Sequence, residues 1–242
     1  MSALLSWERS DFTAVGITHP VHRKGSGPGV IVIHEVPGLT PQVIAFGEEL
    51  VAAGYTTVLP ELFGRNEEPL TGRSAMRTLA KVCVSREFHV LAAGKTTPVA
   101  GWLRALARSL HADLGGPGVG ALGMCFTGGF ALAMMLEDAV VAPVLAQPST
   151  PFAIGRHRSA DLGLSPADLE AVRVRCSRGQ EVLGLRYLSD PAVGTRFTTL
   201  TEELGSAFLK VELAGKGHST LTNERQQEAV DAVLAFFSRR LR

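Results

Sequence analysis

Short runs of apolar residues alternate along the chain with longer amphipathic stretches. The runs are five to seven residues long and rich in Val, Leu and Ile, which is typical of buried strands. They span Gly29–His34, Tyr55–Leu59, Gly118–Met124, Val140–Leu145, Val182–Tyr187 and Leu209–Leu213. A weaker alternation from Phe12 to His22 predicts an antiparallel hairpin at the N-terminal edge of the sheet.

The amphipathic stretches carry start signals for helices. A Ser or Thr stands directly before a proline, as an N-cap before the first helical residue, at Thr40-Pro41, Thr97-Pro98 and Ser165-Pro166. Asn223 is expected to cap the last helix. The apolar residues of that helix fall on one face, at Ala229, Val230, Val233, Phe237 and Leu241. Strands that alternate with helices predict the α/β class, with a mostly parallel central sheet and helices on both faces.

Composition narrows the partners that this chain can have. Of its 242 residues, 45% are hydrophobic and 19% are charged, a balance typical of globular proteins. The 24 basic and 23 acidic residues give a net charge of +1, so no overall field would recruit nucleic acid or a membrane surface. No apolar run approaches the roughly 18 residues of a membrane-spanning helix. The expected partner is a small molecule.

The cysteines and the N-terminal residues indicate the cellular compartment that the protein is expected to occupy. Cys83, Cys125 and Cys176 form no C-x-x-C pair and no disulfide framework, which suits a reducing compartment. The N-terminal residues lack the basic start and the apolar stretch of a signal peptide. We therefore expect a cytoplasmic protein, as a monomer or a small homo-oligomer.

Candidate chemistry stands at the carboxyl ends of the predicted strands, where sites gather in parallel sheets. Glu35 follows the first strand, and Cys125 follows the third. Asp190 comes just after the fifth strand, and His218 lies in a glycine-spaced loop after the sixth. Nucleophile, acid and histidine thus occur in the chain order of the α/β-hydrolase triad.

Each of these residues also has an ordinary structural explanation. Free cysteine is among the most buried residue types, and an aspartate before proline is a common turn former. Most histidines are structural or exposed, although Gly215 and Gly217 would free the backbone to aim His218. The occurrence of all three types at strand ends favours the catalytic interpretation.

The chemistry accounts for these residue types. A thiol attacks as thiolate, so it needs a base within reach and a carboxylate that orients the base. A nucleophile on a strained strand-to-helix turn also needs small neighbours, and Gly123 meets this demand. The backbone N–H of Phe126, directly after Cys125, is one expected donor to the oxyanion.

Four segments now carry a family resemblance: HEVPGL, GMCFTGG, LSDP and GKGHST. In this order and spacing they resemble the dienelactone hydrolase family of the α/β-hydrolase superfamily. The resemblance runs from about Val30 to the C-terminus. It implies a single α/β-hydrolase domain over residues 1–242, without a cofactor or a metal.

The resemblance also implies a role for each site residue. Cys125 matches the nucleophile, Asp190 the acid and His218 the base. Glu35 matches a glutamate that engages the thiol in the resting enzyme, and the N–H of Val36 matches the second oxyanion donor. The implied activity is cleavage of a lactone or carboxylic ester through an acyl-enzyme thioester.

Two departures from the family pattern affect these expectations. Thr127 stands where the family elbow usually has a glycine. The arginine that binds a substrate carboxylate shortly after the histidine is also missing, since Thr222 stands in that region. We therefore expect neutral substrates, unless a cation comes from elsewhere, at Arg65, Arg73 or Arg77.

Other functions remain open at this point. The same triad serves a general carboxylesterase or a thioesterase, and a hydrolase fold can also be a non-catalytic binding scaffold. A zinc-protease helix is excluded, because Gly38 stands where the H-E-x-x-H motif needs its second histidine. The glycines of Gly25–Gly29 precede a strand rather than follow one, so they indicate a turn and not a phosphate loop.

Overall fold

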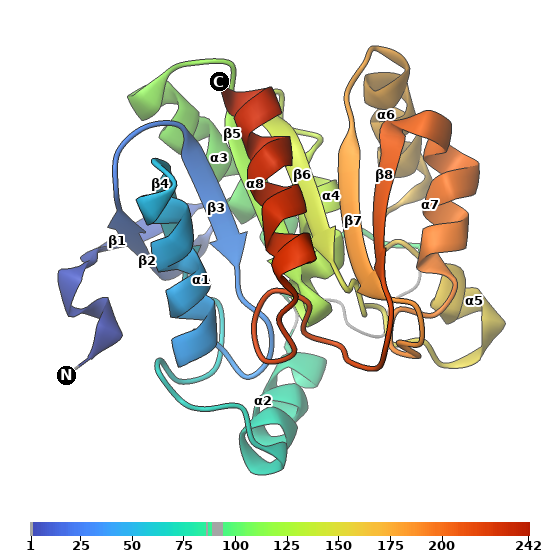
Figure 1. Ribbon diagram of the computed structural model, residues 1–242, viewed down its shortest axis with the longest axis horizontal. Helices are drawn as coiled ribbons and strands as arrows, with labels where there is room; N and C mark the ends of the chain where they lie inside the picture. The colour runs from blue at the N-terminus through green and yellow to red at the C-terminus, as the bar shows by residue number, and fades with distance from the viewer. Residues whose placement is uncertain (1, 86, 89–93) are drawn as a thin grey trace.

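A twisted sheet of eight strands runs through the molecule, in the order β1-β2-β4-β3-β5-β6-β7-β8 (Figure 1). The computed structural model describes residues 2–85, 87–88 and 94–242. The strands are β1 (Glu8–Ala14), β2 (Ile17–Lys24), β3 (Gly29–Ile33), β4 (Thr56–Pro60), β5 (Val119–Met124), β6 (Val140–Ala146), β7 (Val182–Tyr187) and β8 (Phe208–Leu213).

The predicted strands are confirmed, with each end shifted by no more than one residue. β1 and β2 form the expected antiparallel hairpin at the sheet edge, which is longer than predicted at both ends. β2 also pairs antiparallel with β4, and the remaining neighbours are parallel. The carboxyl ends of β3, β5, β6, β7 and β8 therefore lie in a row along one edge of the sheet.

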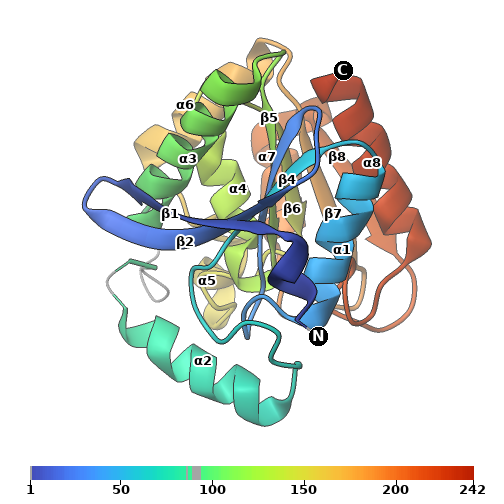
Figure 2. The same cartoon turned by 90° about the vertical axis from the view of Figure 1, so that its left-hand side faces the viewer.

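Helices cover both faces of the sheet, as Figures 1 and 2 show. One face is covered by α1 (Pro41–Ala52) and α8 (Gln227–Leu241). The other is covered by α3 (Val99–Leu114), α4 (Gly128–Met134), α6 (Pro166–Ser177) and α7 (Arg196–Leu204). The remaining helices are η1 (Ala3–Ser6), α2 (Gly72–Val84), η2 (Cys125–Thr127), α5 (Gly155–Ala160) and η3 (Gly205–Ala207). Among the described residues, no helix is both long enough and apolar enough to cross a membrane.

Central strands are apolar on both faces, because each face has its own core. On β3, Val30 and Val32 belong to the core under α1 and α8. Ile31 and Ile33 belong to the core under α3 and α4. This period of two explains why the strand is a continuous apolar run in the sequence.

Two of the predicted helix starts are confirmed by their caps. The Thr40 hydroxyl accepts the N–H of Val43 (3.2 Å), and the Ser165 hydroxyl accepts the N–H of Asp168 (3.1 Å). The cap at Thr97 is wrong: α3 begins at Val99, after a Pro98 without a side-chain cap bond. The Thr97 hydroxyl instead donates to the Glu87 carbonyl (2.5 Å).

The predicted cap at Asn223 is also wrong. The last helix begins at Gln227, and Asn223 lies in a turn before it. This turn is closed by backbone bonds from Arg225 N–H to the Thr222 carbonyl (3.3 Å) and from Gln226 N–H to the Thr220 carbonyl (3.0 Å). Asn223, which the sequence pattern assigns to a helix cap, thus belongs to the loop that carries His218.

Candidate active site

Cys125 is the first residue of η2, on the sharp turn that follows β5. Its φ of +52° is in the left-handed region, which L-residues other than glycine rarely adopt. A side chain at Gly123 would place its Cβ 2.2 Å from the carbonyl oxygen of Thr127, so only glycine fits there. A Cβ at Gly128 would lie 2.5 Å from the Cα of Pro148. The crowded glycines let strand and helix meet closely around the cysteine.

Thr127, the departure from the expected glycine, is fully buried and joins this turn to β3. Its hydroxyl accepts the N–H of Met124 (3.0 Å). The same oxygen lies 2.9 Å from the Ile33 carbonyl, 3.0 Å from the Met124 carbonyl and 3.1 Å from the His34 carbonyl, which share its one proton. Threonine is therefore accommodated by a bond that links the turn carrying Cys125 to the end of the neighbouring strand.

Replacing Thr127 with valine is expected to destabilise the fold by about 1–3 kcal/mol, because it keeps the shape but leaves buried backbone groups without a partner. Thermal or urea unfolding measures the change. Thr127→Ser retains the hydroxyl and is the matched control. Equal stability of the Val and Ser variants would show that the hydroxyl bond contributes nothing.

Asp190 and His218 form a close polar pair of the site. The Nδ1 of His218 lies 2.7 Å from Oδ2 of Asp190, whose side chain is almost fully buried. The other oxygen, Oδ1, accepts the N–H of Ala192 (2.9 Å), which fixes the carboxylate. Burial alone would lower the pKa of His218, but hydrogen bonds to Asp190 and Cys125 and their charges raise it above the ordinary 6.5.

The loop that carries His218 is held from several sides. Gly215 has a φ of +91°, and a Cβ at Gly217 would lie 2.6 Å from the Tyr187 ring. The carboxylate of Glu224 accepts the N–H of Ser219 (2.8 Å). Glu224 was not predicted from the sequence. Its role depends on a turn that brings it back onto the loop, and no motif signals that turn.

Glu35 is buried two residues after the end of β3, and hydroxyl groups surround it rather than a thiol. Thr222 Oγ1 donates to its Oε1, and Ser219 Oγ donates to its Oε2 (3.0 Å). Burial raises the pKa of Glu35, while the bonds from these two hydroxyls and the charge of His218 oppose the rise. Within the described part of the chain, no hydrogen bond joins Glu35 to Cys125, in contrast to the expected resting contact.

A second polar residue that the sequence did not reveal, Gln147, completes this cluster. It follows β6 at a φ of +35° and is fully buried. Its Nε2 donates to Glu35 (3.4 Å), and its Oε1 accepts the hydroxyl of Thr220 (2.7 Å). Strained backbone at a strand end is a common feature of functional sites. Gln147 thus connects Glu35 to the loop that carries His218.

His34 has a structural role beside these residues. It is fully buried, and burial lowers its pKa to about 4, so its ring is neutral near pH 7. Its Nδ1 lies 3.1 Å from the Glu35 carbonyl, and its Nε2 accepts the N–H of Leu62 (3.1 Å). The ring thereby fixes the chain at the end of β3.

One cavity, with a volume of about 270 Å³, brings the predicted residues together. Glu35, Cys125 and His218 line it, with Val36 and Phe126, whose amides were the expected oxyanion donors. The N–H of Val36 takes part in no hydrogen bond among the residues that the structure describes. Asp190 lies behind His218 and does not line the cavity.

The cavity wall is otherwise mostly apolar: Leu70, Ala75, Leu79, Phe152, Ala153 and Ala192, besides Ser149 and Ser219. None of the three candidate cations, Arg65, Arg73 and Arg77, lines it. Arg77 forms an ion pair with Glu68 instead. In the described part of the chain, no group of three or more His, Cys, Asp or Glu side chains could hold a metal ion.

Known proteins of similar structure share this fold over nearly their whole length. The dienelactone hydrolase of Anabaena variabilis is 18% identical, with a TM-score of 0.67, over 98% of this chain and 100% of the other. A cold-adapted esterase from an Arctic intertidal metagenomic library is 17% identical, with a TM-score of 0.64, over 98% of this chain and 96% of the other. At such identities the likeness establishes the α/β-hydrolase fold.

A third such structure is a dienelactone hydrolase-like promiscuous phosphotriesterase from metagenomic libraries. It is 16% identical, with a TM-score of 0.65, over 98% of both chains. We found no match among curated proteins. The sequence model of the dienelactone hydrolase family matches residues 15–154, which is more than half of the chain and includes Glu35 and Cys125. The chain therefore belongs to the dienelactone hydrolase family of ester and lactone hydrolases.

Proposed function

We propose that the protein hydrolyses a lactone or carboxylic ester with Cys125 as nucleophile, His218 as general base and Asp190 as the group that orients His218. The observation that supports this most is the 2.7 Å contact between Asp190 and His218, whose ring lines one cavity with Cys125. The strained backbone of Cys125 supports it further.

The first half of the reaction forms an acyl-enzyme. His218 takes the thiol proton as the sulfur attacks the carbonyl carbon. The N–H groups of Val36 and Phe126 stabilise the resulting oxyanion. The tetrahedral intermediate then collapses, the C–O bond to the alcohol breaks, and the alcohol leaves with the proton from His218. A thioester on Cys125 remains.

The second half releases the acid. His218 takes a proton from a water molecule, which attacks the thioester carbonyl. Collapse of the second tetrahedral intermediate breaks the C–S bond, frees the carboxylic acid and returns the proton to the sulfur. Asp190 stays ionised and stabilises the imidazolium in both halves.

Hydrolysis of p-nitrophenyl acetate by the purified protein tests this proposal, with Cys125→Ala as the decisive variant. Turnover that vanishes in Cys125→Ala supports it. Turnover that is the same in the variant would assign catalysis to another residue. Complete absence of turnover with esters, lactones and thioesters would favour the non-catalytic scaffold.

We further propose that Glu35 is a positioning residue for the thiol and histidine. It acts through Ser219 and Thr222, which both follow His218 and whose hydroxyl groups donate to the Glu35 carboxylate. Glu35→Gln is expected to lower kcat by about 10- to 100-fold with the fold intact, because small displacements of reacting groups are costly. The pH dependence of iodoacetamide labelling of the thiol is expected to change with it.

Glu48→Gln, which alters a surface ion pair with Lys24, is the matched control for that experiment. Steady-state kinetics, the thiol titration and the melting temperature are measured for both variants. If Glu35→Gln turns over and titrates like the wild type, Glu35 is only a buried structural carboxyl.

The substrate is expected to be neutral beside the reacting group. No Lys or Arg lines the cavity, and Glu35 adds acidic character. A buried carboxylate without a cation or enough donors is strongly disfavoured. Two p-nitrophenyl esters test this, one whose acyl chain ends in a methyl ester and one whose acyl chain ends in the free acid. The value of kcat/KM should be at least about 10-fold higher for the methyl ester. A clear preference for the acid would mean that one of Arg65, Arg73 and Arg77 reaches the cavity.

A further inference from the structure

The cavity beside Cys125 has an apolar side wall that the reaction itself does not use. The segment that contains α2 contributes Leu70, Ala75 and Leu79, and Phe152 and Ala153 come from the segment after β6. In Figures 1 and 2, α2 lies beyond the carboxyl edge of the sheet, apart from the two helix layers. This helix therefore covers the site, while its Val82 reaches the core under α3 and α4.

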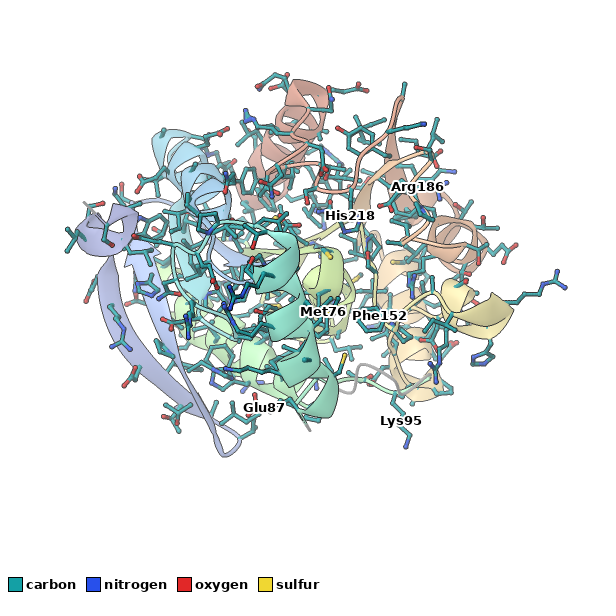
Figure 3. The ribbon with its side chains drawn as sticks, turned by 90° about the horizontal axis from the view of Figure 1, so that it is seen from below. Met76, Glu87, Lys95, Phe152, Arg186 and His218 are labelled. Atoms are coloured by element: carbon teal, nitrogen blue, oxygen red, sulfur yellow. The ribbon has the colours of Figure 1, made fainter. Side chains whose placement is uncertain are left out.

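The wall continues outward as an exposed apolar rim. Leu70 is 40% exposed, Met76 on α2 is 70% exposed, and Ile154, next to Ala153, is 68% exposed. Figure 3 views the molecule from this end, with Met76, Phe152 and His218 labelled. Exposed apolar side chains that gather around a cavity mark a binding surface. None of the basic residues of α2 lines the cavity, and Arg77 pairs with Glu68.

α2 is also tied to the residues of the reaction. The hydroxyl of Thr78 donates to the Pro37 carbonyl (3.3 Å), directly after Val36. At its N-terminus, Ser74 and Thr71 form a capping box, and the Ser74 hydroxyl also donates to the Pro69 carbonyl (2.9 Å). The apolar wall is thus fixed relative to the proposed oxyanion donor.

We propose that this wall binds an uncharged aliphatic chain of the substrate, so that esters with a chain of several carbons are preferred over acetates and methyl esters. The inference rests on the hydrolase function proposed above and specifies its substrate class. A cavity of about 270 Å³ is slightly smaller than most small-molecule pockets, which hold about 300–1,000 Å³. A longer chain would fill it and reach the rim at Met76.

The test compares two ester series with the wild-type enzyme. One series varies the acyl chain of p-nitrophenyl esters from two to eight carbons, and the other varies the alcohol chain of acetate esters over the same range. In the series whose chain contacts the wall, kcat/KM should rise roughly fourfold for each of the first added methylenes. This comparison also shows whether the acyl or the alcohol chain occupies the wall.

Variants of the wall identify where the chain binds. If the acyl chain binds at the wall, Leu79→Ser should lower the ratio of kcat/KM for the hexanoyl ester to that for the acetyl ester at least tenfold. If the alcohol chain binds there, the ratio for the hexyl ester to the methyl ester should fall by the same factor. Met76→Ser should reduce the ratio only for the eight-carbon chain. Ala75→Leu, which fills the cavity, should shift the optimum to a shorter chain, and it keeps the test valid if Leu79→Ser unfolds. Val174→Ser, at an exposed apolar residue of α6 that does not line the cavity, is the matched control.

Three outcomes overturn the inference. Cys125-dependent turnover with no dependence on chain length in either series shows that the wall does not bind a chain, while the proposed function stands. If Val174→Ser changes the long-to-short-chain ratios of kcat/KM as much as Leu79→Ser does, the wall is likewise not the site that binds the chain. If no ester is turned over at all, the proposed function fails, and the substrate class fails with it.

Discussion

Replacement of Asp190 with asparagine is expected to lower kcat by about 10⁴-fold while the protein stays folded. The carboxylate accepts the Nδ1–H of His218 at 2.7 Å and so leaves Nε2 free to act as a base. An amide at this position can present its NH₂ group to Nδ1, which favours the wrong tautomer of the imidazole. Steady-state kinetics on a p-nitrophenyl ester measure the loss, and circular dichroism checks the fold.

Two other carboxylates, Asp161 and Glu181, are the alternatives to Asp190 as the group that orients His218. Asp161 accepts the N–H groups of Gly94 and Gly163, each at 2.7 Å, and Glu181 pairs with Arg239. Glu181→Gln should therefore leave kcat unchanged. A loss of only tenfold in Asp190→Asn would mean that another group orients His218.

Cys125 is expected to be the sole essential thiol. Cys125→Ala should lower kcat by about 10⁴-fold or more, since removal of a nucleophile disables the whole triad. Cys176 is a poor nucleophile, because burial raises the pKa of its thiol to about 11. Cys83 is half-buried on α2 and does not line the cavity.

Iodoacetamide labelling followed by peptide mapping identifies the thiol whose modification abolishes activity. The loss of activity should follow the modification of Cys125, and Cys83→Ala and Cys176→Ala should retain both the activity and its sensitivity to the reagent. Inactivation that follows labelling of Cys83 or Cys176, with Cys125 unmodified, would contradict the assignment.

Much of the fold follows from local patterns in the sequence. Apolar runs bounded by glycine or proline predict the central strands closely, because both faces of these strands are buried and few other structures suit such runs. The rule that sites lie at the carboxyl ends of parallel strands then selects Cys125 and His218 among several cysteines and histidines. Both side chains line the same cavity.

The supporting contacts of the site were not predictable in the same way. Thr127, Gln147 and Glu224 act through partners that are remote in sequence or folded back by a turn, and no periodicity records such contacts. The contact between Glu35 and the thiol, which the resemblance implies, also depends on the residues around Glu35. Thr222 stands where a family arginine was expected, and its hydroxyl donates to Glu35 directly.

The most direct test is mass spectrometry of the enzyme quenched in acid during turnover of a p-nitrophenyl ester. The proposed mechanism predicts a mass increase of one acyl group, located on the peptide that contains Cys125 and removed by hydroxylamine as expected for a thioester. The acyl group should be absent in Cys125→Ala. An acyl group on Ser149 or Ser219, which line the same cavity, would contradict the assignment of Cys125 as the nucleophile.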